Sequence, residues 1–442
     1  MKPTKFRSLL LLVVAFLSLA IFACGDDDDD DDTGGPTATA TQPPAGETAT
    51  ATETVKQYDV GVSDTEIKIG NTIPYSGPAA AYGTIGKALE AYFKKVNEEG
   101  GINGRKIVFV TRDDQYSPDK TVQAVRELVE QEKVFAVFQT LGTPPNSAIW
   151  DYLNQQEVPH LFVATGASKW GADPELHPWT MGWQPTYVAE SKIYVEYLRR
   201  EKPGAKVAIL YQNDDYGKDY LDGFKEGLGA DAASTIVAEL NYAVTDASVN
   251  AQVAQLKESG ADVFFLVATP KFATQALVAA AQIGWEPLIL LNSVSSSIPA
   301  VVQPAMEQAG EKAVSNVVTT FYIKDPGDPQ WADDPAIKEY LAFMEEYYPE
   351  GNPLDGFNVY GYSVAQTIAH VLEQCGDNLT RENLLAQATN IKDLRIDTLL
   401  PGILINTSPT DYYPIEAEQL AKFNPAEKKW DLFGEVIDVS ES

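Results

Sequence analysis

Short apolar runs alternate along most of the chain with longer segments whose apolar residues recur at helical spacing. Residues 66–70 alternate apolar and polar side chains as a strand does, and the apolar positions between Ile85 and Val96 then lie three or four residues apart. The first series of expected elements has strands at 66–70, 106–110, 134–138 and 160–163, and helices at 85–96, 117–130 and 146–153. The second series has strands at 207–211, 236–240, 263–267 and 288–291, and helices at 219–228, 247–258 and 272–283.

Regular alternation of strand and helix predicts an α/β protein with parallel sheets covered by helices on both faces. A Pro-containing loop at residues 184–185 and a break at 201–205 separate the two series, so we expect two lobes. The third section is less regular, with a strand at 317–321, helices at 335–347, 357–372 and 381–388, and short strands and turns at 403–439. We expect this section to return to the first lobe, which creates a hinge and a cleft between the lobes.

Length and charge exclude some classes of function. The chain has 442 residues, which predicts two or three domains, and its net charge of −30 disfavours a nucleic-acid partner. Apolar residues make up 44% of the chain, enough to build large cores. Two cysteines cannot form a disulfide framework, and the dispersed His160, His177 and His370 do not predict a metal site.

The first residues are typical of an export signal. Lys2, Lys5 and Arg7 precede an apolar run at 9–23, which is short for a membrane-spanning helix. The run ends in Ile21-Phe22-Ala23-Cys24, which resembles the bacterial lipobox, where the cysteine after the cleavage site is lipidated. We therefore expect residues 1–23 to be a signal peptide and Cys24 to carry a lipid; the alternative is a secretory peptide or an anchor that ends in a cysteine.

Residues 24–57 are expected to be a disordered linker. Seven aspartates at 26–32 are followed by a segment rich in Thr, Ala and Pro without apolar periodicity, which cannot bury enough surface to offset its ordering entropy. A lipid on Cys24 and this spacer would tether the lobes to the outer face of the cell membrane, outside the cytoplasm or in the periplasm. Cys375 is then a lone thiol, for which we expect a buried structural position.

Catalytic and nucleotide-binding motifs are missing from the sequence. Residues 83–87 look like a phosphate-binding loop but lack its spacing and the hydroxyl after Lys87, and the glycines at 100–104 precede a strand instead of following one. The sequence contains no G-x-S-x-G elbow, no H-E-x-x-H motif and no cysteine pair at metal spacing. We expect neither a cofactor nor an enzymatic activity.

An ordered set of short motifs resembles a known family. The motifs lie at residues 66–70, 76–78, 82–83, 97–104 (NEEGGING), 113–114, 210–219 (LYQNDDYGKD) and 321–325. The set is similar to the type I periplasmic solute-binding proteins of ABC importers, in the class that binds leucine, isoleucine and valine. The resemblance implies two doubly wound lobes joined by three crossovers near residues 184, 317 and 405. The first lobe would then contain 58–184 and 318–405, and the second 185–317 and 406–442.

The resemblance also implies a ligand site and partners. In that family hydroxyls and backbone N–H groups of two first-lobe loops hold the ligand's carboxylate; the matching positions are Leu141, Gly142, Thr143, Thr165, Gly166, Ala167 and Ser168. The first loop opens a helix, whose N-terminus favours an anion. The alternative is that Thr143 and Ser168 only cap helices or form turns. The implied partners of this monomer are a small ligand, a membrane permease and its ATPase subunits.

The second lobe departs from the family pattern. Ser293-Val294-Ser295 stands where an acidic residue pairs with the ligand's ammonium, a second acidic position falls near Pro185, and a family tyrosine falls at Ala268 or Thr269. Because a buried ammonium without a charge partner is costly, we favour a small aromatic or aliphatic acid over branched-chain amino acids, the second hypothesis. Tyr82, Trp170, Trp183 and Tyr216 would suit an apolar ligand body, although each could simply pack in the core. A ligand-sensing module for a membrane receptor is the other functional class considered.

Overall fold

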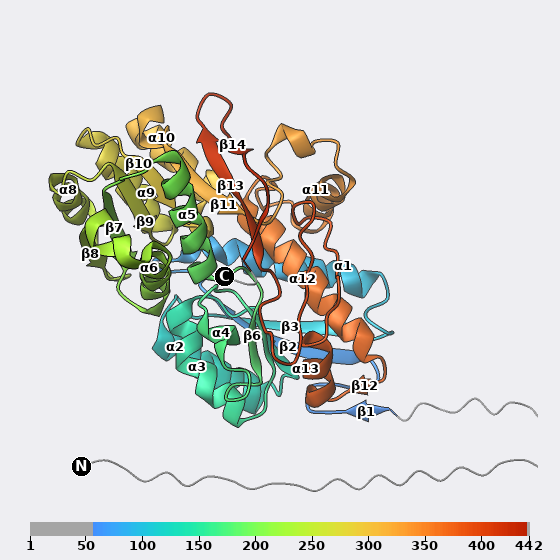
Figure 1. Cartoon of the computed structure of the whole chain (residues 1–442). Coiled ribbons are helices and arrows are strands. Elements are labelled where there is room, and N and C mark those ends of the chain that lie inside the picture. The colour runs from blue at the N-terminus through green and yellow to red at the C-terminus, as the bar shows by residue number, and fades with distance from the viewer. Residues whose placement is uncertain (1–55, 440–442) are drawn as a thin grey trace, which may run out of the picture. The chain divides into compact units, whose positions relative to one another are not determined.

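The first lobe is built on a five-stranded parallel sheet. The computed structural model describes residues 56–439, and the sheet has the order β3-β2-β4-β5-β6 (Figure 1). Its strands are β2 (Glu66–Ile73), β3 (Lys106–Asp113), β4 (Ala136–Phe138), β5 (His160–Val163) and β6 (Thr180–Gly182). The chain runs from β2 outward to β3 and then to the other side at β4, so the direction of winding changes between β2 and β4. Ligands of such sheets bind outside the carboxyl ends of the strands at this switch point.

The helices of the first series follow their strands as the sequence predicts. They are α1 (Gly83–Glu98), α2 (Pro118–Arg126), α3 (Thr143–Gln155) and the short α4 (Lys169–Ala172). The helix predicted at 117–130 is α2 continued by a π-helical turn at Glu127–Gln131. The apolar positions of α1, such as Ile85 and Leu89, are buried against the sheet, which is the hydrophobic pattern that predicted the helix.

The second lobe repeats this winding and adds antiparallel strands. Its sheet runs β14-β13-β11-β10-β9-β7-β8, with β15 paired to β13. The parallel strands are β7 (Val207–Gln212), β8 (Ile236–Tyr242), β9 (Val263–Val267), β10 (Leu288–Leu291) and β11 (Val317–Phe321). The antiparallel strands are β13 (Ala417–Asn424), β14 (Lys429–Leu432) and β15 (Ile437–Asp438). The helices are α5 (Tyr187–Glu201), α6 (Asp215–Leu228), α7 (Ala232–Thr235), α8 (Asn250–Glu258), α9 (Pro270–Gln282) and α10 (Gln303–Ala309).

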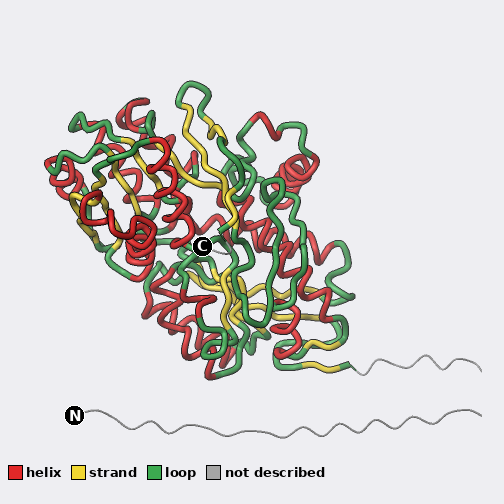
Figure 2. The backbone as a smooth tube through the Cα atoms, in the orientation of Figure 1, coloured by secondary structure: helices red, strands yellow, loops and turns green. Residues whose placement is uncertain are grey.

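The third section returns to the first lobe. Helix α12 (Gly356–Cys375) packs along α1, and α11 (Pro335–Tyr347) and α13 (Arg381–Ala388) flank it (Figure 1). Strand β12 (Asn378–Leu379) pairs with β1 (Gln57–Tyr58). Figure 2 shows that residues 389–416 form a long loop between α13 and β13. Cys375 is buried in this section, as expected for a structural thiol.

The positions where the chain crosses between the lobes correct the expected boundaries. The first crossing lies between β6 and α5, close to the expected residue 184. All of β11 pairs with β10 and β13, so the second crossing follows Phe321 and not residue 317. The hydroxyl of Tyr412 donates to the carbonyl of Pro178 at 3.1 Å in the first lobe, so the third crossing lies between Tyr412 and β13 and not at 405. Gln57, expected in the linker, already pairs in β1.

The expected α/β class with two doubly wound lobes is confirmed. The signal peptide, Cys24 and most of the linker lie outside the described residues. Among residues 56–439, no helix combines the length and apolar character needed to cross a bilayer. In the same part of the chain, no group of three or more His, Cys, Asp or Glu residues could hold a metal ion.

Candidate functional site

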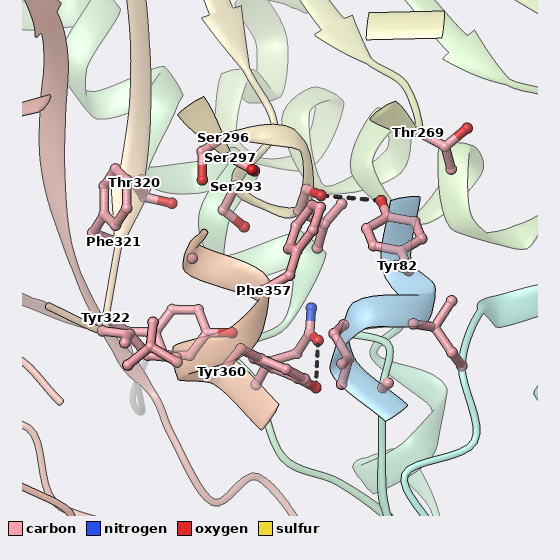
Figure 3. Close-up of a pocket in the computed structure, with 18 of the residues that line it drawn as sticks. Tyr82, Thr269, Ser293, Ser296, Ser297, Thr320, Phe321, Tyr322, Phe357 and Tyr360 are labelled. Carbon is pink, nitrogen blue, oxygen red and sulfur yellow. Dashed lines mark hydrogen bonds between the residues drawn. The ribbon is translucent and has the colours of Figure 1, made fainter. Parts of the chain in front are cut away.

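A cavity lies between the two lobes at the carboxyl ends of their strands. Its empty volume is about 970 Å³, including space open to solvent. The first lobe contributes the turn before α1, the loop after β4 and the start of α12, and the second lobe contributes the loops after β9, β10 and β11 (Figure 3). Aromatic side chains form much of the lining: Tyr82, Tyr116, Tyr187, Tyr216, Phe321, Tyr322, Phe357 and Tyr360.

Thr143 offers a hydrogen-bond donor to this cavity. Its Oγ1 lies 2.6 Å from Oγ1 of Thr165, and both side chains are buried. The Thr165 oxygen accepts the N–H of Ala167 at 3.3 Å and the indole N–H of Trp170 at 3.4 Å. A hydroxyl has two acceptor positions and one proton, and the Tyr187 hydroxyl also lies 3.4 Å from this oxygen, so we infer that Thr165 donates its own proton to Thr143. The Thr143 proton is thereby left for the cavity that Thr143 lines.

The start of α3 offers fewer backbone N–H donors than the sequence suggests. Pro144 and Pro145 stand in its first turn and have no N–H, so Thr143 alone among the first three residues of α3 can donate from the backbone. Gly142 has φ 97°, and a Cβ there would overlap the ring of Tyr116. Glycine is therefore required for the loop to pass beneath Tyr116.

Tyr216 supplies a second donor from the other lobe. Its hydroxyl oxygen accepts from Nδ2 of Asn292 at 2.8 Å, which leaves its own proton available. Burial raises the pKa of Tyr216 well above 10, so the hydroxyl stays protonated at neutral pH. The Asn292 side chain is fixed in turn, because its Oδ1 accepts the N–H of Ala268 at 3.0 Å.

The charged residues of the lining are mostly neutralised by the protein. Nζ of Lys324 lies 2.7 Å from Oδ2 of Asp334 and donates to the carbonyl of Asp397 at 2.8 Å. Asp325 accepts the N–H of Gly327 at 2.9 Å, and burial raises its pKa to about 6. Asp325 also borders a smaller depression beside Trp331 and Trp430, which places it at the edge of the cavity. The aromatic middle of the cavity therefore has no charged side chain of its own among the described residues.

Seven of the residues predicted for the site line the cavity: Tyr82, Leu141, Gly142, Thr143, Tyr216, Thr269 and Ser293. Thr165 lies directly behind Thr143 and contacts it. The structure thus brings both first-lobe loops together, although after β5 only Ala164, directly before the predicted Thr165, lines the cavity.

The other predicted residues have different contacts. The carbonyl of Gly166 accepts the N–H of Tyr187 at 2.8 Å, and the N–H of Ala167 donates to Thr165. Ser168 donates from Oγ to Asp219 of the second lobe at 2.6 Å, so it joins the lobes beside the cavity. The prediction that these three residues bind the ligand is therefore corrected, because none of them lines the cavity.

The remaining corrections concern buried aromatic and small residues. Trp183 is fully buried, and its indole N–H donates to Thr367 at 3.0 Å, behind Tyr360. Trp170 packs against Trp150, and Ala268 is fully buried. Trp170 and Trp183 therefore pack in the core, which was the alternative considered from the sequence.

Several lining residues were not predicted. Phe357 and Tyr360 stand three residues apart on α12, the spacing of one helix face, but only the return of the chain to the first lobe brings them to the cavity. Tyr116 follows β3, Gln184 lies on the first crossing, and Tyr187 begins α5. A search of every loop that follows a strand would have found Tyr116, which stands two residues after Asp114.

Most of the described chain matches one family of proteins. The family model described as "Periplasmic binding protein" matches residues 66–416. The protein named Leu/Ile/Val-binding protein homolog 7 of Brucella abortus (strain 2308) is 22% identical over 325 residues, which cover 72% of this chain and 79% of the relative.

Solved structures share the fold. The fatty acid ABC transporter substrate-binding protein from Thermomonospora curvata has a TM-score of 0.73 and 25% identity, with 87% of this chain and 95% of that one covered. The branched chain amino acid ABC transporter from Thermus thermophilus with bound valine has a TM-score of 0.74 and 16% identity, with 86% and 98% covered. At 16% identity, the second likeness concerns the fold alone.

Proposed function

Because the chain belongs to the periplasmic binding protein family, we propose that it is the extracytoplasmic solute-binding protein of an ABC importer and captures a small carboxylate-bearing ligand between its lobes. The family is one of solute-binding proteins and not of enzymes. The proposed partners are the ligand, a membrane permease and the ATPase subunits that drive it. The protein would act as a monomer.

The observation that carries the proposal is the donor arrangement at Thr143. The hydrogen bonds around Thr165 direct the Thr143 proton toward the cavity, and Tyr216 adds a second hydroxyl. Hydrogen bonds from preset hydroxyls to a carboxylate are charge-assisted and stronger than neutral ones. The aromatic lining would then cover the apolar body of the ligand.

The ligand we favour is a small aromatic or aliphatic acid. Ser293–Ser295 occupies the place where an acidic residue was expected, which removes the direct partner of an ammonium group. One structural relative at 25% identity is named for fatty acid transport, whereas another was solved with valine and a curated relative is named for leucine, isoleucine and valine. Branched-chain amino acids therefore remain the second hypothesis.

The proposed cycle is capture, closure and delivery. Hydrogen bonds join the lobes at separate places. Ser168 donates to Asp219, and the Tyr82 hydroxyl donates to the carbonyl of Val294 at 3.0 Å, the bond drawn from Tyr82 in Figure 3. A ligand that touches both lobes favours the closed arrangement by the difference between its affinities for the two states. The closed form would dock on the permease and release its ligand there.

Membrane attachment is proposed from the sequence alone. A lipid on Cys24 would hold the protein at the outer face of the cell membrane through the linker that follows. Mass spectrometry of the mature N-terminus tests the attachment directly. The Cys24→Ser variant should appear in the soluble fraction, and an unmodified Cys24 in the membrane-extracted protein would refute the anchor.

Calorimetry and X-ray scattering test the function. Titration of residues 56–439 with a panel of aromatic acids, aliphatic acids and aliphatic amino acids should identify at least one tight ligand, and scattering should show a smaller radius of gyration with that ligand. Tight leucine binding without any acid binding would refute the favoured ligand class. Failure of every carboxylate in the panel to bind would refute the proposed function.

A further inference from the structure

A buried carboxyl group fixes the orientation of one lining residue. Glu190 on α5 is 2% exposed and lies directly behind Ser293. Its Oε1 accepts the Ser293 N–H at 2.8 Å, and its Oε2 accepts the Ser293 hydroxyl at 2.7 Å. The hydroxyl of Tyr220 donates to the same carboxyl group at 2.6 Å, and the Tyr194 hydroxyl lies 2.8 Å from it and 2.7 Å from the carbonyl of Leu291. Burial raises the pKa of Glu190, and the hydrogen bonds that it accepts oppose that shift.

Ser293 can therefore only accept a hydrogen bond from the cavity. Its single hydroxyl proton is directed to Glu190, so the lone pairs of its oxygen are what a ligand meets. Three other lining hydroxyls are in the same situation. Tyr82 donates to the carbonyl of Val294, Ser297 to Asp355 at 2.8 Å and Thr320 to Glu418 at 2.9 Å.

We call these four hydroxyls, of Tyr82, Ser293, Ser297 and Thr320, the acceptor wall. Figure 3 shows all four side chains around the upper part of the cavity. The carboxyl groups behind the wall belong to Glu190, Asp355 and Glu418, each less than 9% exposed. The cation of the lining, Lys324, is held by Asp334.

The cavity thus presents two chemically opposite kinds of hydroxyl. Thr143 and Tyr216 present protons, whereas the acceptor wall presents lone pairs. A second carboxylate at the wall would meet repulsion, and an apolar group would leave the Ser293 oxygen without a partner. A hydroxyl or an ammonium group would satisfy it.

Building on the proposed function, we propose that the ligand carries a hydrogen-bond donor, a hydroxyl or an amine, in addition to its carboxylate, and that Ser293, positioned by Glu190, selects for this donor. The inference narrows the ligand class to hydroxy acids and amino acids. It also gives the ammonium of an amino acid an acceptor, the Ser293 hydroxyl oxygen, whose own proton is directed to Glu190.

Matched ligands test the selection. Phenylalanine, 3-phenyllactate and 3-phenylpropionate share one skeleton and differ only in carrying an ammonium, a hydroxyl or a hydrogen. Leucine, 2-hydroxy-4-methylpentanoate and 4-methylpentanoate form an aliphatic set, and 4-hydroxyphenylacetate with phenylacetate places the donor at the far end. In calorimetry at pH 8, at least one set should show the donor-bearing member binding about tenfold or more tighter than the unsubstituted acid.

Two variants locate the selection at Ser293. In Glu190→Gln the amide oxygen should take the place of Oε1, where it accepts the Ser293 N–H. The amide nitrogen then takes the place of Oε2 and donates to the Ser293 hydroxyl oxygen. This change frees the serine proton for the cavity. The ratio of affinities between the donor-bearing ligand and the unsubstituted acid should then fall toward one or reverse. Ser293→Ala should also remove the preference for donor-bearing ligands, while it keeps the hydrogen bond from the backbone N–H of residue 293 to Glu190. This variant tests the role of Ser293 even if Glu190→Gln does not fold. Glu196→Gln, an exposed position on the same helix, is the control.

Each outcome is decisive. Equal affinities within every set would overturn this inference and leave the proposed function standing. An unchanged preference in both Glu190→Gln and Ser293→Ala would overturn the assignment to Ser293. Failure of every carboxylate to bind would overturn the proposed function, and this inference with it.

Discussion

The hydroxyl oxygens of Thr143 and Thr165 lie 2.6 Å apart, on loops that follow the neighbouring strands β4 and β5. The pair joins a buried network on one side, where Trp170 donates to Thr165, to the interlobe cavity on the other. This geometry makes Thr143 the donor to a ligand carboxylate in the proposed function.

Replacement of Thr143 by valine should weaken ligand binding. Valine keeps the shape but removes the hydroxyl, so a charge-assisted hydrogen bond of about 1.5–3 kcal/mol is lost, which corresponds to roughly a tenfold to hundredfold rise in Kd. Calorimetry with the carboxylate that binds the wild type measures the change. Thr143→Ser retains the hydroxyl and should bind within a few-fold of wild type. Equal binding by the valine variant would remove Thr143 from the site.

The contact between Ser168 and Asp219 is predicted to stabilise the closed form, although neither residue touches the ligand. Asp219 accepts both the N–H and the hydroxyl of Ser168, at 3.0 and 2.6 Å, and neither residue lines the cavity. Asp219→Ala should lower the population of the closed form and raise Kd about threefold to tenfold, since a hydrogen bond contributes about 1 kcal/mol. Stopped-flow binding should show the change mainly in the dissociation rate.

Asp222→Ala is the matched control for Asp219→Ala. Asp222 is exposed on the same helix, so its loss should leave the affinity unchanged. Scattering of ligand-bound Asp219→Ala should give a larger radius of gyration than ligand-bound wild type. Identical affinities for Asp219→Ala and wild type would show that this contact does not contribute to closure.

Periodicity predicted the regular part of the fold well. The expected strands at 160–163, 263–267, 288–291 and 317–321 have the bounds that the structure shows. Buried parallel strands such as β9 (VFFLV) and β10 (LILL) are continuous apolar runs, which makes them easy to recognise. The family resemblance to Leu/Ile/Val-binding proteins is also confirmed. Strand β6 and helix α5 were missed; β6 has only three residues, and α5 carries a buried glutamate on its inner side.

The site was harder to predict because tertiary contacts decide which polar groups remain available. The sequence singles out Thr143 and Ser168 as similar loop hydroxyls, yet the position of Asp219 on the other lobe removes Ser168 from the site. Glu190 lies in the first turn of α5, a helix that the periodicity did not predict, and has no motif around it. Only the packing of α5 behind Ser293 gives it a role.

Gly166→Ala should destabilise the protein. A Cβ at Gly166 would overlap the carbonyl oxygen of Pro185 and contact the Tyr187 ring, where the loop after β5 meets the first crossing. Overpacking of this kind costs about 1–3 kcal/mol, which chemical unfolding can measure. Gly356→Ala is the control, because nothing lies within 4 Å of a Cβ there and the residue begins α12. Equal unfolding free energies for Gly166→Ala and wild type would contradict the packing.

The buried carboxyl of Glu418 predicts how stability depends on pH. Burial, together with the negative charge of Glu190, raises the pKa of Glu418 well above its ordinary value of 4.5. Burial also raises the pKa of Asp114 to about 6 and that of Glu416 to about 7. The folded state therefore keeps protons that the unfolded state has released, so the free energy of unfolding should fall as pH rises from about 5 to 8.

Glu418→Gln should flatten this decline and stabilise the protein at pH 8. The amide keeps the oxygen that accepts a hydrogen bond from the Thr320 hydroxyl, and it carries no charge. The free energy of unfolding should therefore rise by on the order of 1 kcal/mol at pH 8 and change little at pH 5. Carboxyls whose pKa is lowered, such as that of Asp262, affect stability only below about pH 4 and do not enter this window. Chemical unfolding at pH 5, 6.5 and 8 measures the slope, with the exposed Glu427→Gln as control. A parallel decline in Glu418→Gln and wild type would mean that Glu418 does not contribute to the pH dependence.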